Sequence, residues 1–357
     1  MTTPRRRVLS GMQPSGLMHL GNYLGALENW KALQEQYDCY FFVADWHALS
    51  TNYADTSRIR TFVREMLIDW LAGGIDPERS TIFIQSRIPE HAILHLLLSM
   101  MTPVSWLERN PTYKEKQEEI KEKDLTTYGF LGYPVLQAAD ILLYKPDFVP
   151  VGKDQLPHLE LTRELARRFN DIYKTAVFPE PKEHLTKFPK VVGTDGRKMS
   201  KSYNNAINLS DTEPVVRQKL KTMVTDPARV RRTDPGNPDL CPLYEFHKIY
   251  SPQAIQVQVN QDCRTAAIGC IDCKKLVADR MVEQLTPIWD ARTKLTQHPS
   301  RVEEIVEAGS NRAAAVASAT ASSFAATTRV LMASVTEVAE FFNRLPRPKS
   351  EAEDIAA

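Results

Sequence analysis

The sequence has little net charge and few cysteines. Its 45 lysines and arginines nearly balance 44 aspartates and glutamates, which leaves a formal charge of +1 over 357 residues. This balance excludes a protein that coats nucleic acid by bulk charge, so a nucleic-acid partner would have to be held by local basic patches. Five cysteines are too few for a disulfide scaffold, but they leave a metal site open.

Long apolar runs are missing as well. No stretch approaches the roughly 18 consecutive apolar residues of a membrane-spanning helix. The basic residues Arg5, Arg6 and Arg7 are not followed by the apolar segment of a secretory signal peptide. The sequence therefore predicts a cytoplasmic protein with no membrane partner.

Apolar periodicity divides the chain into two parts. At about 150 residues per domain, 357 residues predict two or three domains. Up to residue 210, short apolar runs alternate with helical patterns; the predicted strands are 8–10, 39–44 and 81–85, and the predicted helices are 22–37, 56–71 and 89–101. This alternation predicts an α/β domain over 1–210, a Rossmann-type doubly wound parallel sheet with its active site at the carboxyl ends of the strands.

The rest of the chain carries helical patterns and no clear strand. We expect an all-helical domain over 211–345, followed by a flexible tail over 346–357. A charged stretch around 105–130 is predicted to be a solvent-exposed insertion in the first domain.

Two segments of the first domain suit phosphate groups. Glycines between Gly11 and Gly21 let the backbone approach a ligand at the start of a helix, where His19 and Asn22 add polar groups. Between 193 and 205, Lys198 and Lys201 form a cationic loop, and lysine is a compact charge suited to phosphate oxygens. Taken singly, the first segment could be a structural turn and the second a solvated surface loop.

Together these segments resemble a known family. The run from His19 to Asn22 resembles the first signature of class I aminoacyl-tRNA synthetases, and the run from Lys198 to Ser202 matches the second. Gly-x-Gln-Pro-Ser-Gly, followed by Gly-Asn-Tyr, resembles the tryptophanyl-tRNA synthetases in particular, and the likeness extends to about Pro287.

The resemblance implies a two-step reaction on a homodimer bridged by tRNA(Trp). The carboxylate of L-tryptophan attacks the α-phosphate of ATP, which is accompanied by Mg²⁺, and the activated amino acid is then moved to the 3′ end of the tRNA. The implied catalytic residues are His19, Asn22, Lys198 and Lys201. The implied ATP contacts are Gln13, Pro14, Ser15, Gly21, Asn22, Gly152, Lys153, Asp154, Lys198, Met199, Ser200, Lys201 and Ser202.

A second constellation forms the expected amino-acid pocket. Tyr133, Gln137 and Asp140 are spaced to share one face of a helix, and an acidic residue in an apolar run needs a partner if it is buried. Asp140 alone could serve a structural hydrogen bond. The resemblance implies instead that it accepts the indole N–H; the other implied pocket residues are Tyr133, Gln137, Gln155, His47, Leu9 and Val151.

Two other functions stay open at this point. The Tyr-x-x-x-Gln-x-x-Asp pattern also resembles tyrosyl-tRNA synthetases, in which an aspartate accepts a phenol O–H. The residues Gln13, Pro14 and Ser15 favour tryptophan. A synthetase-like RNA-binding or redox-sensing protein without catalysis is the second alternative. It predicts damaged nucleotide loops, whereas both loops carry their lysine, histidine and asparagine residues.

Four cysteines of the second part are spaced like metal ligands. Gaps of 21, 6 and 2 residues separate Cys241, Cys263, Cys270 and Cys273, whereas Cys39 lies in an apolar strand and is expected in the core. Thiolates suit Zn²⁺ and iron–sulfur clusters alike, and the spacing does not choose between them. The surrounding residues resemble a subgroup of tryptophanyl-tRNA synthetases with a C-terminal 4Fe-4S cluster.

Basic residues accompany these cysteines. They are Arg229, Arg231, Arg232, Lys274 and Lys275. Phosphate contacts from such a patch would position a tRNA, and the resemblance implies anticodon binding in this region. A solvated helix face is the alternative for each single residue.

Overall fold

The core of the fold is a parallel sheet. A computed structural model describes residues 5–111, 113–114, 124–185 and 191–329. Among these residues, one sheet has the strand order β3-β2-β1-β4-β5, and all of its neighbouring strands run parallel. The strands are β1 (Arg7–Met12), β2 (Asp38–Val43), β3 (Ser80–Ile84), β4 (Phe148–Val151) and β5 (Lys182–Leu185). The predicted α/β parallel-sheet fold is therefore confirmed.

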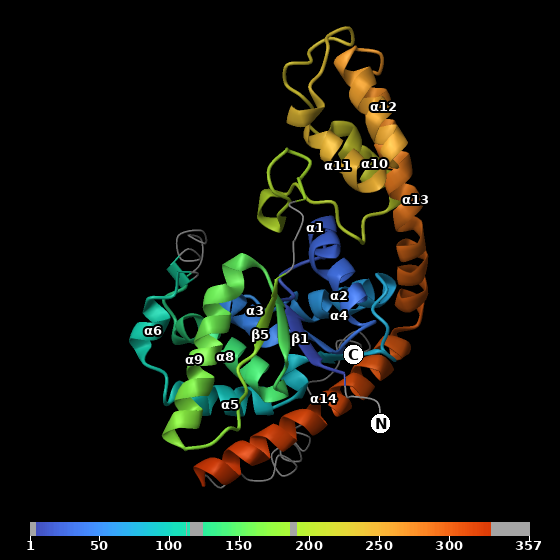
Figure 1. Cartoon of the computed structure of the whole chain (residues 1–357). Coiled ribbons are helices and arrows are strands. Elements are labelled where there is room, and N and C mark those ends of the chain that lie inside the picture. Colours follow the sequence, from blue (N-terminus) through green and yellow to red (C-terminus); the bar gives the residue numbers. More distant parts are fainter. Residues whose placement is uncertain (1–4, 112, 115–123, 186–190, 330–357) are drawn as a thin grey trace.

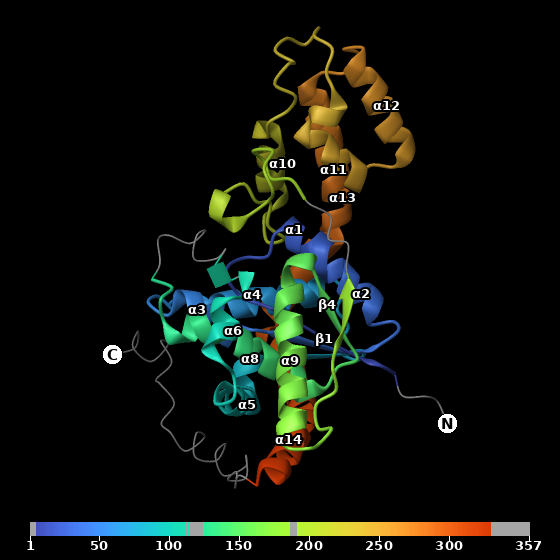
Figure 2. The same ribbon diagram turned by 60° about the vertical axis from the view of Figure 1, so that its left-hand side comes forward.

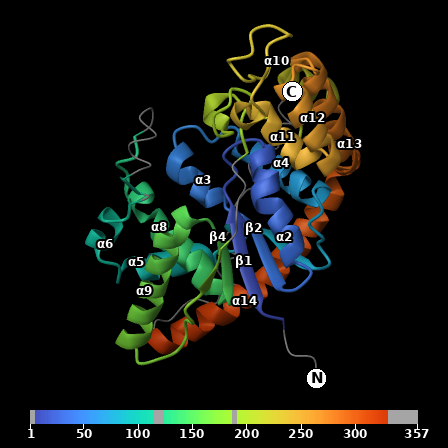
Figure 3. The same cartoon turned by 45° about the horizontal axis from the view of Figure 1, so that its top comes forward.

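Helices cover both faces of this sheet (Figure 1, Figure 3). In the first part of the chain they are α1 (Leu20–Asn22), the π-helical turn η1 (Tyr23–Leu27), α2 (Glu28–Leu33), α3 (Asp45–Asn52), α4 (Ile59–Ala72), η2 (Gln85–Arg87), α5 (Glu90–Ser99), α6 (Val104–Glu108), α8 (Tyr128–Tyr144), η3 (Lys153–Gln155) and α9 (Leu156–Ile172). In the second part they are η4 (Lys201–Tyr203), α10 (Glu213–Thr222), η5 (Pro238–Leu240), α11 (Pro242–Tyr250), α12 (Gln253–Arg264), α13 (Cys270–Gln297) and α14 (Pro299–Thr328).

Alternate strand residues feed two apolar cores. Successive side chains of a strand point to opposite faces, and a parallel sheet covered on both faces needs apolar residues in both positions. Val8 and Phe41 pack with α2 and α4 on one face, and Leu9 and Phe42 pack with α5, α8 and α9 on the other. Cys39 is fully buried in the first core, as predicted.

The three strands predicted from apolar runs are confirmed, but two strands and the helices α3 and α9 are additional. β4 is apolar but has only four residues and contains Pro150, which argues against a strand, while β5 is polar and exposed and lacks an apolar run. The helix α3 was not predicted. The predicted helix 22–37 is instead a series of three short elements, α1, η1 and α2.

The second part of the chain is helical, as predicted, and it leaves the sheet and returns to it. Helices α10 to α13 project from the sheet, and α14 crosses beneath it (Figure 1, Figure 2). Arg292 of α13 pairs with the buried Asp69 and with Glu65 of α4, which attaches the long helix to one of the helices that cover the sheet. The predicted tail 346–357 and part of the charged insertion, 112 and 115–123, lie outside the described residues. None of the described helices is both long and apolar enough to cross a membrane.

The return of α14 predicts a strong response to one added methyl group. A Cβ on Gly309 would lie 1.9 Å from the carbonyl oxygen of Ile82 in β3, whereas a Cβ on Gly129 of α8 meets no other atom within 4 Å. We expect Gly309→Ala to lower the free energy of unfolding by about 1–3 kcal/mol through overpacking. Gly129→Ala should leave it unchanged or raise it by up to about 1 kcal/mol. Urea unfolding of both variants measures the difference, and equal stabilities would contradict the close packing.

Candidate active site

A cavity of about 1040 Å³ opens at the carboxyl ends of the strands. Its walls come from the turn after β1, from α1, α3 and α8 and from the end of β4. The loop over residues 193–205, which carries Lys198 and Lys201 and is called the lysine loop below, completes the walls. The predicted site residues that line it are Leu9, Gln13, His19, Gly21, Asn22, His47, Tyr133, Gln137, Asp140, Val151, Gly152, Lys153, Asp154, Gln155, Lys198 and Met199. Pro14, Ser15, Ser200, Lys201 and Ser202 are not among the lining residues.

His19 and Asn22 form a reciprocal cap at the first helix. The Nδ1 atom of His19 accepts from the backbone N–H of Asn22 at 3.2 Å, and Asn22 Oδ1 accepts from the backbone N–H of His19 at 3.3 Å. Burial and the nearby Lys201 lower the pKa of His19 to about 4, so the ring is neutral near pH 7. This cap holds both side chains at the helix start, where backbone N–H groups favour anions.

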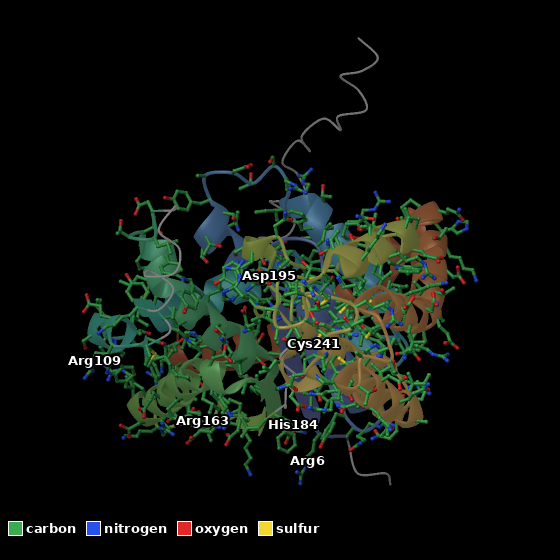
Figure 4. The ribbon with its side chains drawn as sticks, turned by 90° about the horizontal axis from the view of Figure 1, so that it is seen from above. Arg6, Arg109, Arg163, His184, Asp195 and Cys241 are labelled. Carbon is green, nitrogen blue, oxygen red and sulfur yellow. The ribbon has the colours of Figure 1, made fainter. Side chains whose placement is uncertain are left out.

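The lysine loop is a turn held by a buried asparagine. Asn205 is 2% exposed; its Oδ1 accepts from the backbone N–H of Ser200 at 2.9 Å, and its Nδ2 donates to Asp195 Oδ1 at 2.7 Å and to the Lys198 carbonyl at 3.2 Å. Asp195 is labelled in Figure 4. A Cβ on Gly193 would lie 2.2 Å from Asn205 Nδ2, so the loop closes around Asn205 only with glycine at that position.

Lys201 joins the two predicted phosphate segments. Its ammonium donates to the carbonyl oxygen of Gly16 at 3.1 Å and to Ser15 Oγ at 3.4 Å. Gly16 has a φ of +145°, and a Cβ there would lie 3.0 Å from the Lys201 stem. Burial lowers the pKa of Lys201 to about 8, which leaves the side chain mostly charged near pH 7. Lys201 and the glycine-rich turn therefore meet beside the cavity.

Asp140 is buried in a set of hydrogen-bond donors. The carboxylate is 1% exposed. Its Oδ2 lies 2.7 Å from His47 Nε2, while its Oδ1 lies 2.6 Å from His91 Nδ1 and accepts from Gln85 Nε2 at 2.7 Å. The other ring nitrogen of His91 lies 2.8 Å from the hydroxyl of Tyr144. If the Tyr144 O–H donates to Nε2, a neutral His91 carries its proton on Nδ1 and donates it to Asp140.

These donors keep Asp140 ionised. Burial acts to raise the pKa of the carboxyl, but the hydrogen bonds from His47 and His91 outweigh it and hold the pKa well below its ordinary value. A carboxylate offers about four lone-pair positions and these three partners use three of them. One acceptor position on a cavity-lining group is therefore available for a ligand that donates an N–H or O–H.

Two members of this set were missed from the sequence. Gln85 directly follows β3, and His91 lies in α5, which was read only as a packing helix. The signal for Gln85 was its place at the carboxyl end of a strand, at the same edge as the other site residues. His91 carried no such signal, because its contact with Asp140 joins residues 49 positions apart.

The remaining pocket residues are held by local contacts. The hydroxyl of Tyr133 lies 3.1 Å from His158 Nε2, and Gln155 Nε2 donates to Asp154 at 2.8 Å. Gln13 Nε2 donates to the His47 carbonyl at 3.0 Å, which ties the glycine-rich turn to α3. Leu9 and Val151 are buried apolar wall residues. The cavity thus combines an apolar interior with polar groups at fixed positions, which is typical of small-molecule sites.

Figure 4 labels Cys241, the first of the four predicted metal ligands, which lies between η5 and α11; Cys263 lies near the end of α12, and Cys270 and Cys273 lie at the start of α13. Burial and the thiols of Cys241, Cys263 and Cys270 raise the pKa of Cys273 to about 12. All four are free thiols. Among the described residues, however, no group of three or more His, Cys, Asp or Glu side chains is arranged to hold a metal ion. The predicted 4Fe-4S or Zn²⁺ centre is therefore not demonstrated.

The basic residues around the cysteines differ in what they contact. Arg229 donates to the Ile268 carbonyl, Arg232 to the Ala266 and Ala267 carbonyls at 3.2 and 3.3 Å, and Lys274 to the Lys221 carbonyl at 3.0 Å. Arg231 and Lys275 are exposed, and no side-chain partner is found for either within the described part of the chain. Only these last two present their charges to solvent without an internal partner.

Comparison with known proteins places this site in context. Residues 1–286 match the family model described as tRNA synthetases class I (W and Y). The tryptophan–tRNA ligase of Thermotoga maritima is 53% identical over 316 residues, covering 88% of this chain and 96% of the relative. That of Ralstonia nicotianae is 45% identical over 376 residues, covering 86% and 94%.

Solved structures agree with these relatives. The tryptophanyl-tRNA synthetase from Campylobacter jejuni, complexed with ADP and tryptophan, has a TM-score of 0.84 at 31% identity and covers 91% of this chain and 100% of its own. The tyrosyl-tRNA synthetase from Archaeoglobus fulgidus has a TM-score of 0.61 at 21% identity, covering 80% and 90%, which indicates a shared fold only.

The Asp140 set predicts different costs for two buried hydroxyl groups. Tyr144→Phe removes the partner of His91 Nε2, and we expect it to lower the free energy of unfolding by about 1–3 kcal/mol because a buried polar atom is left unsatisfied. Tyr250→Phe is the matched control, since that hydroxyl is buried with no hydrogen-bond partner within the described residues. Denaturant unfolding compares the two. A Tyr250→Phe loss as large as that of Tyr144→Phe would count against the hydrogen-bonded chain.

Proposed function

We propose residue roles for a chain that belongs to the class I tRNA synthetase family of tryptophan and tyrosine enzymes. It is an aminoacyl-tRNA synthetase that uses ATP to activate tryptophan and ligates it to tRNA. The roles rest above all on one observation: a buried carboxylate, Asp140, that lines the cavity and is held by three hydrogen-bond partners. Pyrophosphate exchange with tryptophan is the direct test, and its absence would favour a non-catalytic RNA-binding or redox-sensing role.

Asp140 is proposed to recognise the indole ring. An indole N–H can only donate, and Asp140, kept ionised, can only accept. Leu9 and Val151 would pack against the ring. His47, Tyr133, Gln137 and Gln155 line the same cavity and would orient the amino acid and its α-amino and carboxylate groups.

Tyrosine is the second substrate to be tested, because a phenol O–H also suits an acceptor. Nothing in the described cavity favours it, and the compared tyrosine enzyme is too distant in sequence to support more than the fold. Exchange measured with each amino acid in turn decides between them. Dependence on tyrosine would overturn the proposed role of Asp140.

ATP is proposed to lie between the two signatures. Activation needs in-line placement of the carboxylate and the α-phosphate, together with neutralisation of charge on the departing pyrophosphate. His19 and Asn22, with Gln13, Pro14, Ser15 and Gly21, would hold the triphosphate at the helix start. Lys198 and Lys201 would neutralise the charge of the pyrophosphate. Met199, Ser200 and Ser202 belong to the same loop and would contact ATP beside them. Gly152, Lys153 and Asp154 would contact the nucleotide from the other wall, and Mg²⁺ would accompany ATP with few protein ligands.

The four cysteines are proposed to hold a 4Fe-4S cluster, with Zn²⁺ as the alternative. Two observations support such a group: the three other thiols contribute to the raised pKa of Cys273, and a buried Arg229 Nε has no acceptor within the described residues. Cys241, Cys263, Cys270 and Cys273 would be the ligands. When bound, the group would cross-link four points of the helical part.

Three further features complete the proposal. The chain is proposed to act as a homodimer in the cytoplasm, with tRNA(Trp) contacting a helical C-terminal domain over 211–345 and a catalytic domain over 1–210. Arg231 and Lys275 are the proposed phosphate contacts best supported by their exposure. Their charges suit the local patch that a nearly neutral chain needs for tRNA.

The proposed role of Lys201 predicts a split between rate and binding. We expect Lys201→Ala to lower the rate constant of pyrophosphate exchange by about 10²–10³, because a preorganised charge that acts in the transition state is lost. The KM for ATP should change by less than about threefold. Lys174→Ala, which removes an exposed lysine paired with Asp171, is the control and should match the parent enzyme. Equal losses in rate and ATP binding would refute a transition-state role.

The lowered pKa of Lys201 predicts the pH dependence of activation. The ammonium is charged below its pKa of about 8 and loses its charge as the pH rises through that value. We therefore expect the exchange rate to fall on the alkaline side of about pH 8. Lys201→Arg keeps its charge at every accessible pH and should lack this alkaline decrease, even if it is slower. Rate profiles of both proteins make the comparison, and an unchanged decrease in Lys201→Arg assigns it to another group.

The exposed Arg231 predicts a defect restricted to tRNA. We expect Arg231→Ala to raise the KM for tRNA about tenfold, on the order of 1.4 kcal/mol, and to reduce the salt slope of tRNA binding by about one. Pyrophosphate exchange, which needs no tRNA, should stay unchanged. Arg301→Ala of α14 is the control, because its only close partner among the described residues is the exposed Glu304. Loss of exchange in Arg231→Ala would mean that this residue acts elsewhere.

A further inference from the structure

We propose that a second cavity, beside the active site, binds a phosphate-bearing nucleotide of the tRNA strand. This cavity has a volume of about 650 Å³ and lies where the end of β3 meets α3, α4 and α14. Its volume is in the range of sites that bind small organic molecules. The inference rests on the proposed ligation of tryptophan to tRNA and gives the RNA a contact site on the sheet domain that the sequence motifs do not indicate.

Three arginines give the cavity its positive charge. Arg60 and Arg64 of α4 and Arg87 of η2 line it, and Arg60 and Arg64 are exposed. Within the described part of the chain, no hydrogen bond or ion pair is found for the side chain of either of these two. A guanidinium offers five N–H donors in a planar fork that matches the oxygens of a phosphate group.

The two acidic residues of the cavity wall are already engaged. Asp45 Oδ1 accepts from the backbone N–H of Ser86 at 3.0 Å, and its Oδ2 accepts from the Ser86 hydroxyl. Glu303 of α14 pairs with Arg87, and its side chain is 63% exposed. The wall therefore leaves the two arginines of α4 without a counter-charge.

The positions of Arg60 and Arg64 are unfavourable for α4 itself. They are four residues apart, so two like charges lie on one face of the helix one turn apart and repel each other. Arg60 is also the second residue of the helix, where the macrodipole favours negative charge, and the first turn contains no acidic residue. An anion bound beside both arginines removes this repulsion. Charges placed against local preference are typical of functional surfaces.

Apolar side chains form the interior of the same cavity. Val63 and Leu67 of α4, Ile84 of β3 and Val302 of α14 line it and are buried. An inorganic ion gains nothing from such a surface, whereas the ribose or base of a nucleotide can pack against it. The combination of arginines and apolar walls therefore favours a nucleotide over a free phosphate ion.

The position of the cavity favours an RNA strand as the source of this nucleotide. Asp45 lines it, and His47, two residues along α3, lines the active-site cavity. Gln85, which donates to Asp140, lies two residues before Arg87. The proposed reaction requires the 3′ end of tRNA to enter the active-site cavity, so nucleotides near that end pass close to the second one.

The test compares aminoacylation of a tRNA(Trp) transcript with pyrophosphate exchange, using the full chain. Arg60→Gln, Arg64→Gln and the double variant remove charge from the cavity. Arg58→Gln is the matched control, because Arg58 precedes the same helix, its guanidinium lies over the ring of Phe62 at 4.6 Å, and it does not line the cavity.

We expect Arg60→Gln and Arg64→Gln each to raise the KM for tRNA about five- to tenfold. Each should also reduce the salt slope of tRNA binding by about one, because one phosphate contact is lost. Pyrophosphate exchange with tryptophan needs no tRNA and should stay at the parent rate. Arg58→Gln should match the parent protein in both reactions.

The partner of Arg87 allows a test in the opposite direction. Glu303→Gln removes a carboxylate that competes with phosphate for Arg87, so the KM for tRNA should fall about two- to threefold. Glu304→Gln is the matched control, because the neighbouring Glu304 is exposed, pairs with Arg301 and does not line the cavity. A fall in KM of the same size in both variants would contradict a specific role of Arg87.

A mononucleotide distinguishes an RNA strand from a free nucleotide. Binding of CMP is measured by calorimetry while tryptophan and a non-hydrolysable ATP analogue occupy the active-site cavity. We expect weak binding that the double variant of Arg60 and Arg64 loses, together with its defect in tRNA kinetics. Loss of CMP binding with unchanged tRNA kinetics would overturn the RNA assignment and give the cavity to a free nucleotide.

The remaining outcomes separate this inference from the proposed function. A parent protein that charges tRNA, with a double variant that charges it equally well, overturns the second site and leaves the proposed function intact. Equal defects in Arg58→Gln and in the cavity variants also overturn the site, because they reflect the total charge of this helix. A parent protein that neither exchanges pyrophosphate nor charges tRNA overturns the proposed function, and the inference with it.

Discussion

A buried carboxylate imposes the main constraint on the first half of this chain. Asp140 is 1% exposed, its hydrogen bonds hold the pKa of its carboxyl well below the ordinary value, and a buried charge is tolerated only when donors surround it. Those donors come from α3, from the residue after β3 and from α5, so three elements must reach α8 at hydrogen-bond distance. The same contacts form one wall of the cavity. The interactions that satisfy this charge during folding therefore also prepare the acceptor that is proposed to meet the indole ring.

The parts proposed to bind phosphate have a different requirement, which is that a ligand must be able to reach them. Lysine charges must approach a ligand closely, so they are carried on a turn whose shape is set by Asn205 and by glycines rather than by an apolar core. Lys201 donates to the Gly16 carbonyl at 3.1 Å, which joins this turn to the glycine-rich segment. Burial lowers the pKa of this lysine to about 8, which makes the charge dependent on its surroundings near neutral pH.

The helical part is connected to the sheet by two long helices. The 28 residues of α13 span roughly 40 Å, and Arg292 near its end pairs with the buried Asp69 of α4. The next helix, α14, packs directly on β3, with Gly309 against Ile82. Cysteine and arginine residues at the far end are thereby attached to the catalytic sheet through a stiff element. This arrangement suits a protein that must hold one macromolecule at two distant places.

Local patterns were sufficient for much of this description. The alternation of strands and helices, both phosphate signatures, the shared face of Tyr133, Gln137 and Asp140 and the spacing of the cysteines all depend on residues close together in the chain, where periodicity and backbone preference act. β4 was missed because it is short and contains a proline, and β5 was missed because a polar edge strand lacks an apolar signal.

Contacts between distant segments had to be seen in the fold. The donors of Asp140 come from 49 to 93 positions away, and Arg229 turns towards a cysteine 34 positions along the chain rather than towards solvent. A charged or histidine side chain can be satisfied by solvent or by several different hydrogen-bond partners, and the sequence does not say which. The packing of the folded chain decides which partner it meets. The family signatures therefore identified the chemistry, while the three-dimensional contacts assigned the partners that hold it in place.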